Sequence, residues 1–317
     1  MQIKFAAATD IGQVREANED SYCVLDKLNS IYICDGMGGH VAGATASQLA
    51  IETIMRFNTL FHPASDIDIK KKNPQLVERL DRLNGFLKHP YPEIGKNMVN
   101  GIQLANHQIF ATAEANPQFL GMGTTVVGIG FDNNLCHVAH VGDSRAYLIR
   151  NNSIEQLTED HSWLNELLQS GKIKPEEADK FPHRNVITRA LGVNESVQID
   201  FRSVPAQVGD IYLLSSDGLH DLIQDVEIGA IVTANPDNLE KIVDDLIREA
   251  NLRGGKDNIS VIVAQIVQND SETEVSEFRD SIDEETREMK QLEAEILNLM
   301  VDTDLDETKT ITLSSIS

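Results

Sequence analysis

Short apolar runs that meet an aspartate at one end recur along this chain. The aspartates concerned are Asp20, Asp35, Asp143, Asp217 and Asp257. The runs beside them are rich in Ile, Val and Tyr, a composition and length typical of β-strands. A glycine after the aspartate, as at Gly36 and Gly218, lets the backbone turn away at once. The pattern therefore predicts several carboxylates held rigidly at strand ends.

The same pattern divides the rest of the chain into strands and helices. Strands are predicted at residues 3–9, 21–26, 31–34, 197–204, 210–216 and 258–267, with a further series of strands from Gly123 to Leu157. Helices are predicted at 42–57, 93–115, 219–233 and 236–252, with shorter helical pieces in 160–195. Asn133-Asn134 and Asn151-Asn152 are typical of hairpin turns. Hairpin-linked strands with a few long helices favour an α+β fold of packed antiparallel sheets covered by helices.

The chain is expected to contain one domain at 1–268 and an extension at 269–317. Within the domain, residues 58–92 are irregular and lysine-rich, as expected for a surface insertion. In the extension, apolar residues at 271–301 recur at alternating spacings of three and four, which predicts an amphipathic helix. Its apolar face would pack on its own domain, on a second copy of the chain or on another protein. Residues 308–317 are rich in Ser and Thr and are expected to be disordered.

Charge and composition exclude several classes of function. The formal net charge of −23 argues against nucleic acid as the main partner, and about half of that excess lies in 269–317. The chain has no apolar segment that predicts a signal sequence or a membrane span, so a cytoplasmic location is expected. Cys23, Cys34 and Cys136 are isolated within apolar runs, which predicts buried core residues and no zinc site.

The predicted strand-end carboxylates would repel one another unless a cation lay between them. Hard divalent cations prefer such oxygen ligands, which predicts a site for Mg²⁺ or Mn²⁺. A carboxylate cage can be catalytic or structural. Arg15 lies shortly before Asp20, and an arginine fork matches two phosphate oxygens. Metals with a phosphate-binding arginine favour phosphoryl transfer to water. The sequence lacks both a Cys-x5-Arg nucleophile loop and a glycine-rich nucleotide-binding loop.

Six motifs in order resemble the metal-dependent serine/threonine protein phosphatases (the PPM or protein phosphatase 2C family), most closely its bacterial branch. They are Val14-Arg15-Glu16-Ala17-Asn18-Glu19-Asp20, Asp35-Gly36-Met37-Gly38-Gly39-His40, Gly121-Met122-Gly123-Thr124-Thr125, Val141-Gly142-Asp143-Ser144-Arg145, Ser216-Asp217-Gly218-Leu219 and Asp257-Asn258-Ile259. Each motif alone is weak, but their order and spacing agree across residues 3–267. The resemblance implies a central antiparallel β-sandwich with helices on both outer faces and metals at one end.

The resemblance also implies a set of metal ligands. These are Asp20, Asp35, the Gly36 carbonyl, Asp143, Asp217 and Asp257. Two core ions, Mn²⁺ or Mg²⁺, are expected, with Asp35 bridging both. Asp143 is expected to help hold a weaker third ion, together with Asp217. Glu19 is an alternative ligand beside Asp20.

Further residues are expected to act on the substrate. Arg15 would bind the substrate phosphate. His40 would either protonate the leaving oxygen or hydrogen-bond a group near the metals. Residues 163–192 correspond to the family's flap, in which His183, Arg184 and Arg189 would either contact substrate or remain solvated charges. His161 is expected to be a structural residue at a helix start.

The implied activity is hydrolysis of phosphoserine and phosphothreonine in proteins by a metal-activated water, without a phosphoenzyme. The expected partners are phosphorylated proteins, small regulatory proteins among them, and a cognate Ser/Thr kinase. Two other hypotheses remain open. In the first, the chain is a pseudo-enzyme that binds phosphoproteins without hydrolysing them; the presence of all the core aspartates argues against this. In the second, the chain is an assembly component that self-associates through 271–301.

Overall fold

The computed structural model describes residues 2–39, 41–61, 91–132, 134–181 and 186–268 of the 317-residue chain. In these residues the strands form two antiparallel sheets. The first sheet has the order β1 (Gln2–Asp10), β11 (Ile259–Val267), β10 (Ile211–Ser215), β7 (Arg145–Arg150) and β8 (Ser153–Gln156). The second has the order β2 (Asp20–Leu25), β3 (Ser30–Met37), β5 (Val126–Asp132), β6 (Leu135–Val141) and β9 (Asp200–Pro205), with β4 (Gly123–Thr124) paired to β3.

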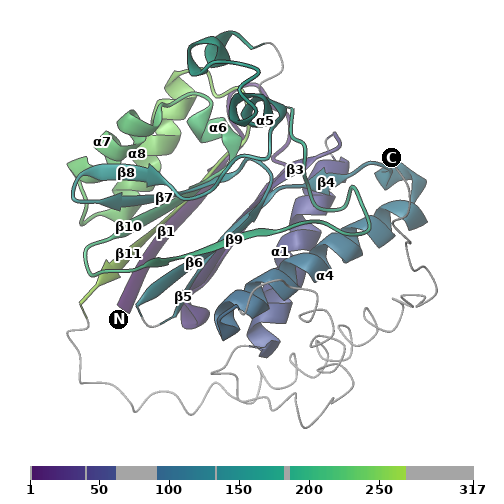
Figure 1. The fold of residues 1–317 in the computed structure, drawn as a ribbon, viewed down its shortest axis with the longest axis horizontal. Helices are drawn as coiled ribbons and strands as arrows, with labels where there is room; N and C mark the ends of the chain where they lie inside the picture. Colours follow the sequence, from purple (N-terminus) through teal and green to yellow (C-terminus); the bar gives the residue numbers. More distant parts are fainter. Residues whose placement is uncertain (1, 40, 62–90, 133, 182–185, 269–317) are drawn as a thin grey trace. The chain divides into compact units, whose positions relative to one another are not determined.

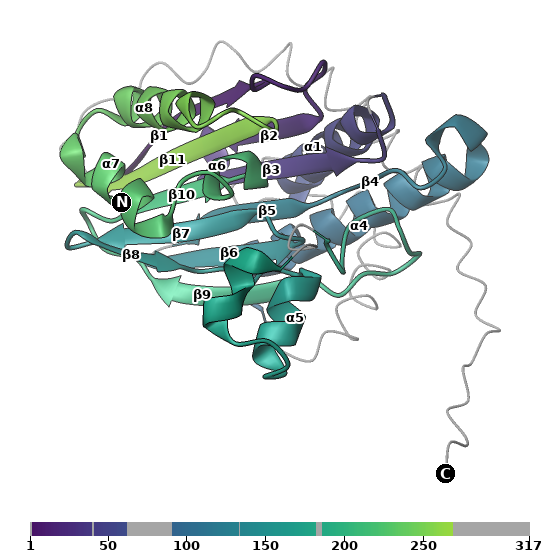
Figure 2. The ribbon, with the colours of Figure 1, turned by 90° about the horizontal axis from the view of Figure 1, so that it is seen from above.

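Helices cover the outer face of each sheet (Figures 1 and 2). The second sheet is covered by α1 (Val41–Phe61) and α4 (Glu93–Ala115). The first is covered by α6 (Asp217–His220), α7 (Asp225–Ala234) and α8 (Leu239–Leu252). A separate helix, α5 (Trp163–Gln169), and the 3-10 turn η3 (Pro175–Lys180) follow β8, while the 3-10 turns η1 (Asp26–Leu28) and η2 (Pro117–Phe119) occupy connections.

The described core consists of three apolar clusters, one at each boundary between layers. Alternation along the strands produces them, because successive side chains point to opposite faces. In β3, Tyr32 packs with the helices α1 and α4, while Ile31 and Ile33 pack between the sheets. In β10, Leu213 packs with α7 and α8, while Tyr212 lies between the sheets. The expected α-β-β-α sandwich is therefore confirmed.

Most predicted elements are present, with two informative differences. The expected helix at 93–115 coincides with α4. The helix expected at 219–233 is instead two helices, because α7 starts afresh at Asp225, where the side chain of Glu227 accepts a hydrogen bond from the backbone N–H of Gln224. The strand expected at 31–34 continues to Met37, since Gly36 and Met37 pair with β4.

Hairpins and cysteines also follow the predictions. Asn151 and Asn152, between β7 and β8, both have positive φ, as a two-residue hairpin turn requires. The three cysteines are buried and unpaired. No helix in the described ranges is long and apolar enough to cross a bilayer.

The expected division of the chain at 268/269 stays a prediction. Residues Met1–Asp270 form one compact unit and Ser271–Ser317 a separate one. The C-terminal helical extension, with its predicted helix at 271–301, and nearly all of the 58–92 insertion lie outside the described residues.

Candidate active site

Asp20 and Asp35 lie side by side on two neighbouring strands. Asp20 opens β2 and is the direct antiparallel partner of Asp35 in β3. The backbone of Asp35 is held by two threonines: its N–H donates to Thr125 Oγ1 at 3.0 Å, and its carbonyl accepts from Thr124 Oγ1 at 2.8 Å. Strand pairing and these bonds fix both carboxylates at one end of the second sheet.

The backbone at Gly36 passes too close to its neighbours for any side chain. A Cβ there would collide with the carbonyl oxygen of Gly43 in α1 and lie 2.6 Å from that of Glu19. The N–H of Gly36 donates to the same Glu19 carbonyl at 3.1 Å. Glycine at this position therefore allows β3 to approach the start of α1, directly beside Asp35.

Two serines of the first sheet bind the carboxylate of Asp20 across the sandwich. Ser216 Oγ and Ser260 Oγ each donate to Asp20 Oδ2 at 2.7 Å. Ser216 follows β10 and immediately precedes Asp217, while Ser260 lies in β11. The two sheets therefore meet at Asp20, and the contact places Asp217 at the same end of the sandwich.

Asp257 reaches this end of the sandwich through the turn before β11. The next residue, Asn258, is buried and binds the segment between β1 and β2 at three points. Its side chain accepts from the N–H of Glu19 at 2.8 Å and donates to the carbonyls of Ile11 and Ala17 at 2.9 and 3.0 Å. This amide connects the Asp257 turn to the segment that carries Arg15 and Asp20.

The aspartates raise one another's pKa values. Burial raises the pKa of Asp20 to about 6, against the hydrogen bonds from Ser260 and Ser216. Withdrawal from solvent, followed by repulsion from Asp20 and Asp217, raises the pKa of Asp35 well above its ordinary value. The pKa of Asp217 is raised by burial and then by Asp143 and Asp257. Mutual repulsion of this kind means that the carboxylates converge in space.

Two oxygens of this group are suited to bind a cation. Among the described residues, Asp20 Oδ1 and Asp217 Oδ1 are buried without a hydrogen-bond partner. A buried carboxylate oxygen without a donor carries a large desolvation cost, which a divalent cation would offset. The donor set of carboxylate oxygens also suits Mg²⁺ or Mn²⁺. The residues present therefore fit the expected metal.

Asp143 lies on the turn between β6 and β7, close to the other aspartates. It is 9% exposed, and burial, followed by repulsion from Asp160, raises its pKa to about 7. It is also the largest electrostatic contributor to the raised pKa of Asp217 after burial. The position suits a cation shared between Asp143 and Asp217.

Arg15 contacts this group of aspartates directly. Its Nη2 lies 2.6 Å from Asp257 Oδ2, and the two side chains are 46% and 34% exposed. The guanidinium is therefore at the solvent side of the site, where an incoming anion would meet it. One end of the sandwich thus combines converging carboxylates with an accessible arginine.

Comparisons with known proteins show which family the chain belongs to. The family model "Protein phosphatase 2C" matches residues 32–167. The serine/threonine phosphatase stp of Listeria welshimeri is 36% identical over 223 residues, which cover 69% of this chain and 79% of that protein. The protein phosphatase PhpP of Streptococcus pneumoniae is 34% identical over 229 residues, 71% of this chain and 82% of that protein. The chain belongs to the protein phosphatase 2C family. It is a protein serine/threonine phosphatase.

Solved structures extend the similarity to the whole fold of the phosphatase. The crystal structure of the Mycobacterium tuberculosis serine/threonine phosphatase PstP/Ppp has a TM-score of 0.71 at 32% identity and covers 84% of this chain and 100% of that one. A structure of the PstP catalytic domain in complex with two manganese ions has a TM-score of 0.66 at 32% identity, covering 84% and 99%.

Three expected site residues are not placed by the structure. His40, His183 and Arg184 lie outside the described residues. Arg189 is described, and it forms an ion pair with Asp200: its Nη1 lies 2.6 Å from Asp200 Oδ1. Its expected contact with substrate stays a prediction. Glu19, the alternative ligand, is buried against Gly43 at the start of α1.

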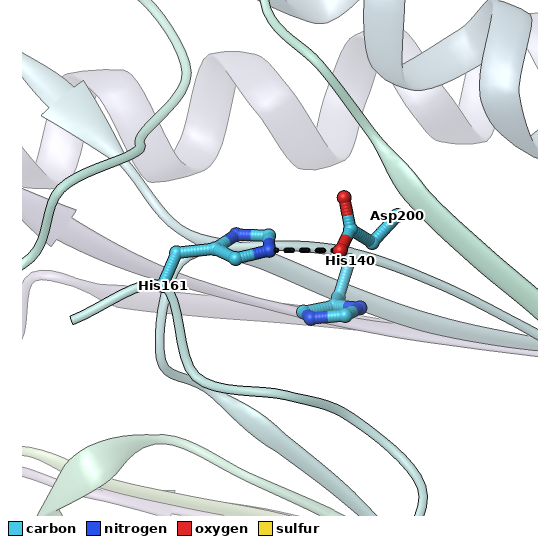
Figure 3. Close-up of side chains that lie close together, drawn as sticks. All are labelled: His140, His161 and Asp200. Carbon is cyan, nitrogen blue, oxygen red and sulfur yellow. Dashed lines mark ion pairs between the residues drawn. The ribbon is translucent and has the colours of Figure 1, made fainter. Parts of the chain in front are cut away.

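The phosphatase has a second cluster of potential metal ligands, His140, His161 and Asp200, whose ligand atoms lie within 4.8 Å of one another (Figure 3). The two imidazole rings stack at 4.7 Å with an angle of 13° between their planes. Because a bound ion lies near the plane of each imidazole, parallel stacked rings do not share one. Arg189 Nη1 also lies 2.9 Å from His161 Nε2. The cluster is therefore a hydrogen-bonded network.

Sequence reasoning missed the residues that hold the aspartates in place. Ser216, Ser260 and Asn258 were not singled out, although each is adjacent or close to a predicted ligand. The signal in the sequence was a small polar side chain inside or beside an apolar run. Such a side chain is expected to be buried, and a buried polar group needs a hydrogen-bond partner. His161, expected to be a structural residue at a helix start, lies one position before Ser162, the N-cap of α5, and its ring accepts a hydrogen bond from the Gly142 backbone.

Proposed function

We propose that this phosphatase hydrolyses phosphoserine and phosphothreonine in proteins with the help of two divalent cations, Mn²⁺ or Mg²⁺. The ligands would be the side chains of Asp20, Asp35, Asp217 and Asp257 and the carbonyl of Gly36. The observation that carries the proposal is the pair of buried, unpartnered oxygens on Asp20 and Asp217 within a group of mutually repelling carboxylates. The manganese ions in the related PstP structure are consistent with it.

The chemistry is divided between the bound ions and the chain. When bound, the ions would activate a water for direct attack on phosphorus and neutralise the phosphate oxygens, so that no phosphoenzyme is needed. Arg15 would bind the phosphate, because a guanidinium presents parallel donors to two oxygens. Its contact with Asp257 places it beside the proposed metal ligands. Ser216 and Ser260 hold Asp20 Oδ2, so Oδ1 would be the oxygen that serves as a ligand.

A weaker third cation would lie between Asp143 and Asp217. The support is the electrostatic coupling of these two carboxylates and the burial of Asp143. Because Asp143 lies on a turn between β6 and β7, its carboxylate depends on the conformation of that turn. We therefore expect lower affinity here than at the core site, to which both sheets contribute.

A metal titration tests the proposal. Release of phosphate from a phosphothreonine peptide should require added Mn²⁺ after treatment with a chelator. Asp35→Asn and Asp217→Asn should each lower activity by at least about a hundredfold, since each removes a charged ligand. Isothermal titration of Mn²⁺ should show lost core binding in both variants.

The matched control is Asp244→Asn, which removes one carboxylate from the exposed face of α8. It should retain both activity and Mn²⁺ binding. Full activity in chelator, or unchanged Mn²⁺ binding in Asp35→Asn, would contradict the proposal.

Phosphorylated proteins are the substrates that the activity implies, and we propose that a cognate Ser/Thr kinase supplies them. Phosphoproteomics after deletion of the phosphatase would identify both, because sites of the opposing kinase should accumulate phosphate. Self-association through 271–301 concerns residues outside those described and stays a prediction, as does a cytoplasmic location.

A further inference from the structure

His161 is bound to the backbone of Gly142 at two points. Its N–H donates to the carbonyl of Gly142 at 2.9 Å, and its ring Nδ1 accepts from the N–H of Gly142 at 3.0 Å. Gly142 immediately precedes Asp143, the ligand proposed for the weaker third cation. The ring of His161 therefore holds the peptide next to that ligand, although His161 itself is 18 residues further along the chain.

One of these bonds determines the state of Nδ1. Because the N–H of Gly142 donates a hydrogen bond to Nδ1, Nδ1 carries no proton. Nε2 lies 3.3 Å from Asp200 Oδ2, and this contact is the dashed line in Figure 3. Arg189 Nη1 lies 2.6 Å from the other oxygen of that carboxylate and 2.9 Å from His161 Nε2, so the guanidinium contacts both the carboxylate and the ring. Burial, His140 and Arg189 lower the pKa of His161 to about 4, which keeps the ring neutral.

Asp200 is held in place by the second sheet. It is the direct strand partner of His140, across the β6–β9 pair. The ring of His140 stacks on that of His161, and its Nε2 lies 2.9 Å from the carbonyl oxygen of Glu159. The rigid sheet therefore orients the imidazole of His161, and the imidazole orients Gly142.

The turn at Gly142 needs such a support. Gly142 has φ of +107°, and a Cβ there would lie 2.6 Å from Thr125 Cγ2. On the other side of Asp143, Ser144 Oγ lies 2.7 Å from Thr125 Oγ1. The side chain of the residue after Asp143 is thus held by Thr125, and the backbone of the residue before it by His161.

We propose that His161 is a positioning residue for Asp143: its Nδ1 holds the Gly142 peptide so that the Asp143 carboxylate faces Asp217 and the weaker cation. The inference rests on the role proposed above for Asp143. It adds that the segment from Thr188 to Asp200 acts on that cation through His161, whose carbonyl also accepts from the N–H of Thr188 at 2.8 Å.

Three substitutions of His161 separate positioning from simple packing. His161→Asn keeps an acceptor at the Nδ1 position but loses the ring and Nε2. His161→Phe keeps the ring and the stack on His140 but has no acceptor. His161→Gln reaches the Nε2 position and leaves the Nδ1 position empty. If His161 positions Asp143, His161→Asn should retain the weaker cation binding and His161→Phe should lose it. If His161 only packs, the two variants should behave in the opposite way.

The experiment is a Mn²⁺ titration of the full-length chain, with free Mn²⁺ followed by electron paramagnetic resonance. The weaker binding event should lose affinity by about 10- to 100-fold in His161→Phe and His161→Gln, the usual effect of removing a group that orients a ligand. His161→Asn should stay within about threefold of the unchanged protein. The tighter events should be unaffected in all three variants, and thermal unfolding confirms that each is folded.

Asp143→Asn serves as the reference for loss of the weaker site. Loss of weaker binding in Asp143→Asn with unchanged binding in both His161→Phe and His161→Gln would overturn the positioning role while leaving the role of Asp143 intact. Weaker binding that survives Asp143→Asn would overturn both. If His161→Asn binds the weaker Mn²⁺ poorly and His161→Phe binds it normally, the ring acts through packing alone, and the inference is overturned.

Discussion

Arg15 Nη2 lies 2.6 Å from Asp257 Oδ2, so the residue proposed to bind phosphate touches a residue proposed to bind metal. The two come from the segment between β1 and β2 and from the turn before β11. Their contact keeps the guanidinium at the edge of the carboxylate group, in a partly exposed position. A cation at Asp257 would compete with Arg15 for the carboxylate, and Arg15 would then be available to an anionic substrate.

The first prediction concerns Arg15→Lys. Lysine keeps the charge but lacks the planar fork, so one of two charge-assisted hydrogen bonds to the phosphate should be lost. Such a bond contributes about 1.5–3 kcal/mol, which corresponds to a fall in kcat/KM of roughly 10- to 150-fold. Steady-state kinetics on a phosphothreonine peptide measures the change. Arg248→Lys, on the exposed surface of α8, is the matched control and should behave as the unchanged protein. Equal kinetics in both variants would exclude a fork contact.

The second prediction concerns pH and the metal-free protein. The pKa values of Asp20 and Asp143 are raised from 3.8 to about 6 and about 7. Between these values the folded state binds more protons than the unfolded state. The contribution of the two carboxyls to the free energy of unfolding is therefore fully present below pH 3.8, and it is lost as pH rises through about 6 for Asp20 and about 7 for Asp143. Each carboxylate should lower the free energy of unfolding by about 1.4 kcal/mol per pH unit within its window.

Urea unfolding in chelator, from pH 5 to pH 8, measures this slope. Asp20→Asn should flatten the profile and be more stable than the unchanged protein at the upper end, because the repelling charge is gone. Added Mn²⁺ should restore stability at pH 8 in the unchanged protein, since a ligand that binds only the folded state stabilises it. The histidines whose pKa values are lowered by burial add a slope of the opposite sign, so the difference between the two proteins is the decisive quantity. An Asp20→Asn profile parallel to that of the unchanged protein would contradict the assignment.

The third prediction concerns Gly36→Ala. The added Cβ would collide with the Gly43 carbonyl in α1 and crowd that of Glu19 just before β2, and both are backbone atoms of packed segments. Overpacking of this kind costs about 1–3 kcal/mol in stability, and the displaced Asp35 should also lower activity. Thermal unfolding and the peptide assay measure both effects. Gly229→Ala in α7, where the nearest atom is an Ile154 side-chain carbon at 3.2 Å, should retain activity. An active and stable Gly36→Ala would show that the close approach is unimportant.

The fourth prediction concerns Asn258→Ala. The substitution removes one acceptor and two donated hydrogen bonds that hold the segment from Ile11 to Glu19, and leaves the buried N–H of Glu19 without this acceptor. An unsatisfied buried group of this kind costs about 1–3 kcal/mol. Because Arg15 lies in this segment, KM for the phosphopeptide should rise together with the loss of stability. Urea unfolding and steady-state kinetics check the two effects, and a stable variant with unchanged KM would contradict the proposed support.

The layers of the fold were predictable from the sequence because apolar alternation is a local signal. Tyr32 and Ile33 face opposite sides of β3 for this reason. The extension of β3 to Met37 was not predictable, since it depends on pairing with β4 across the Gly36–Thr124 register. The core aspartates were recognisable because each lies in a local motif. The network of His161, Arg189 and Asp200 was not, because it depends on contacts between distant segments. The β6–β9 register places Asp200 beside His140, on whose ring that of His161 stacks.

Asp20 accepts hydrogen bonds from Ser216 and Ser260, which belong to the opposite sheet. Any substitution that lets one layer slide over the other therefore alters the charge distribution where catalysis is proposed to occur, even when it lies far away in the sandwich interior. Distant interior variants of this enzyme should accordingly be screened for altered metal preference as well as for lost thermostability.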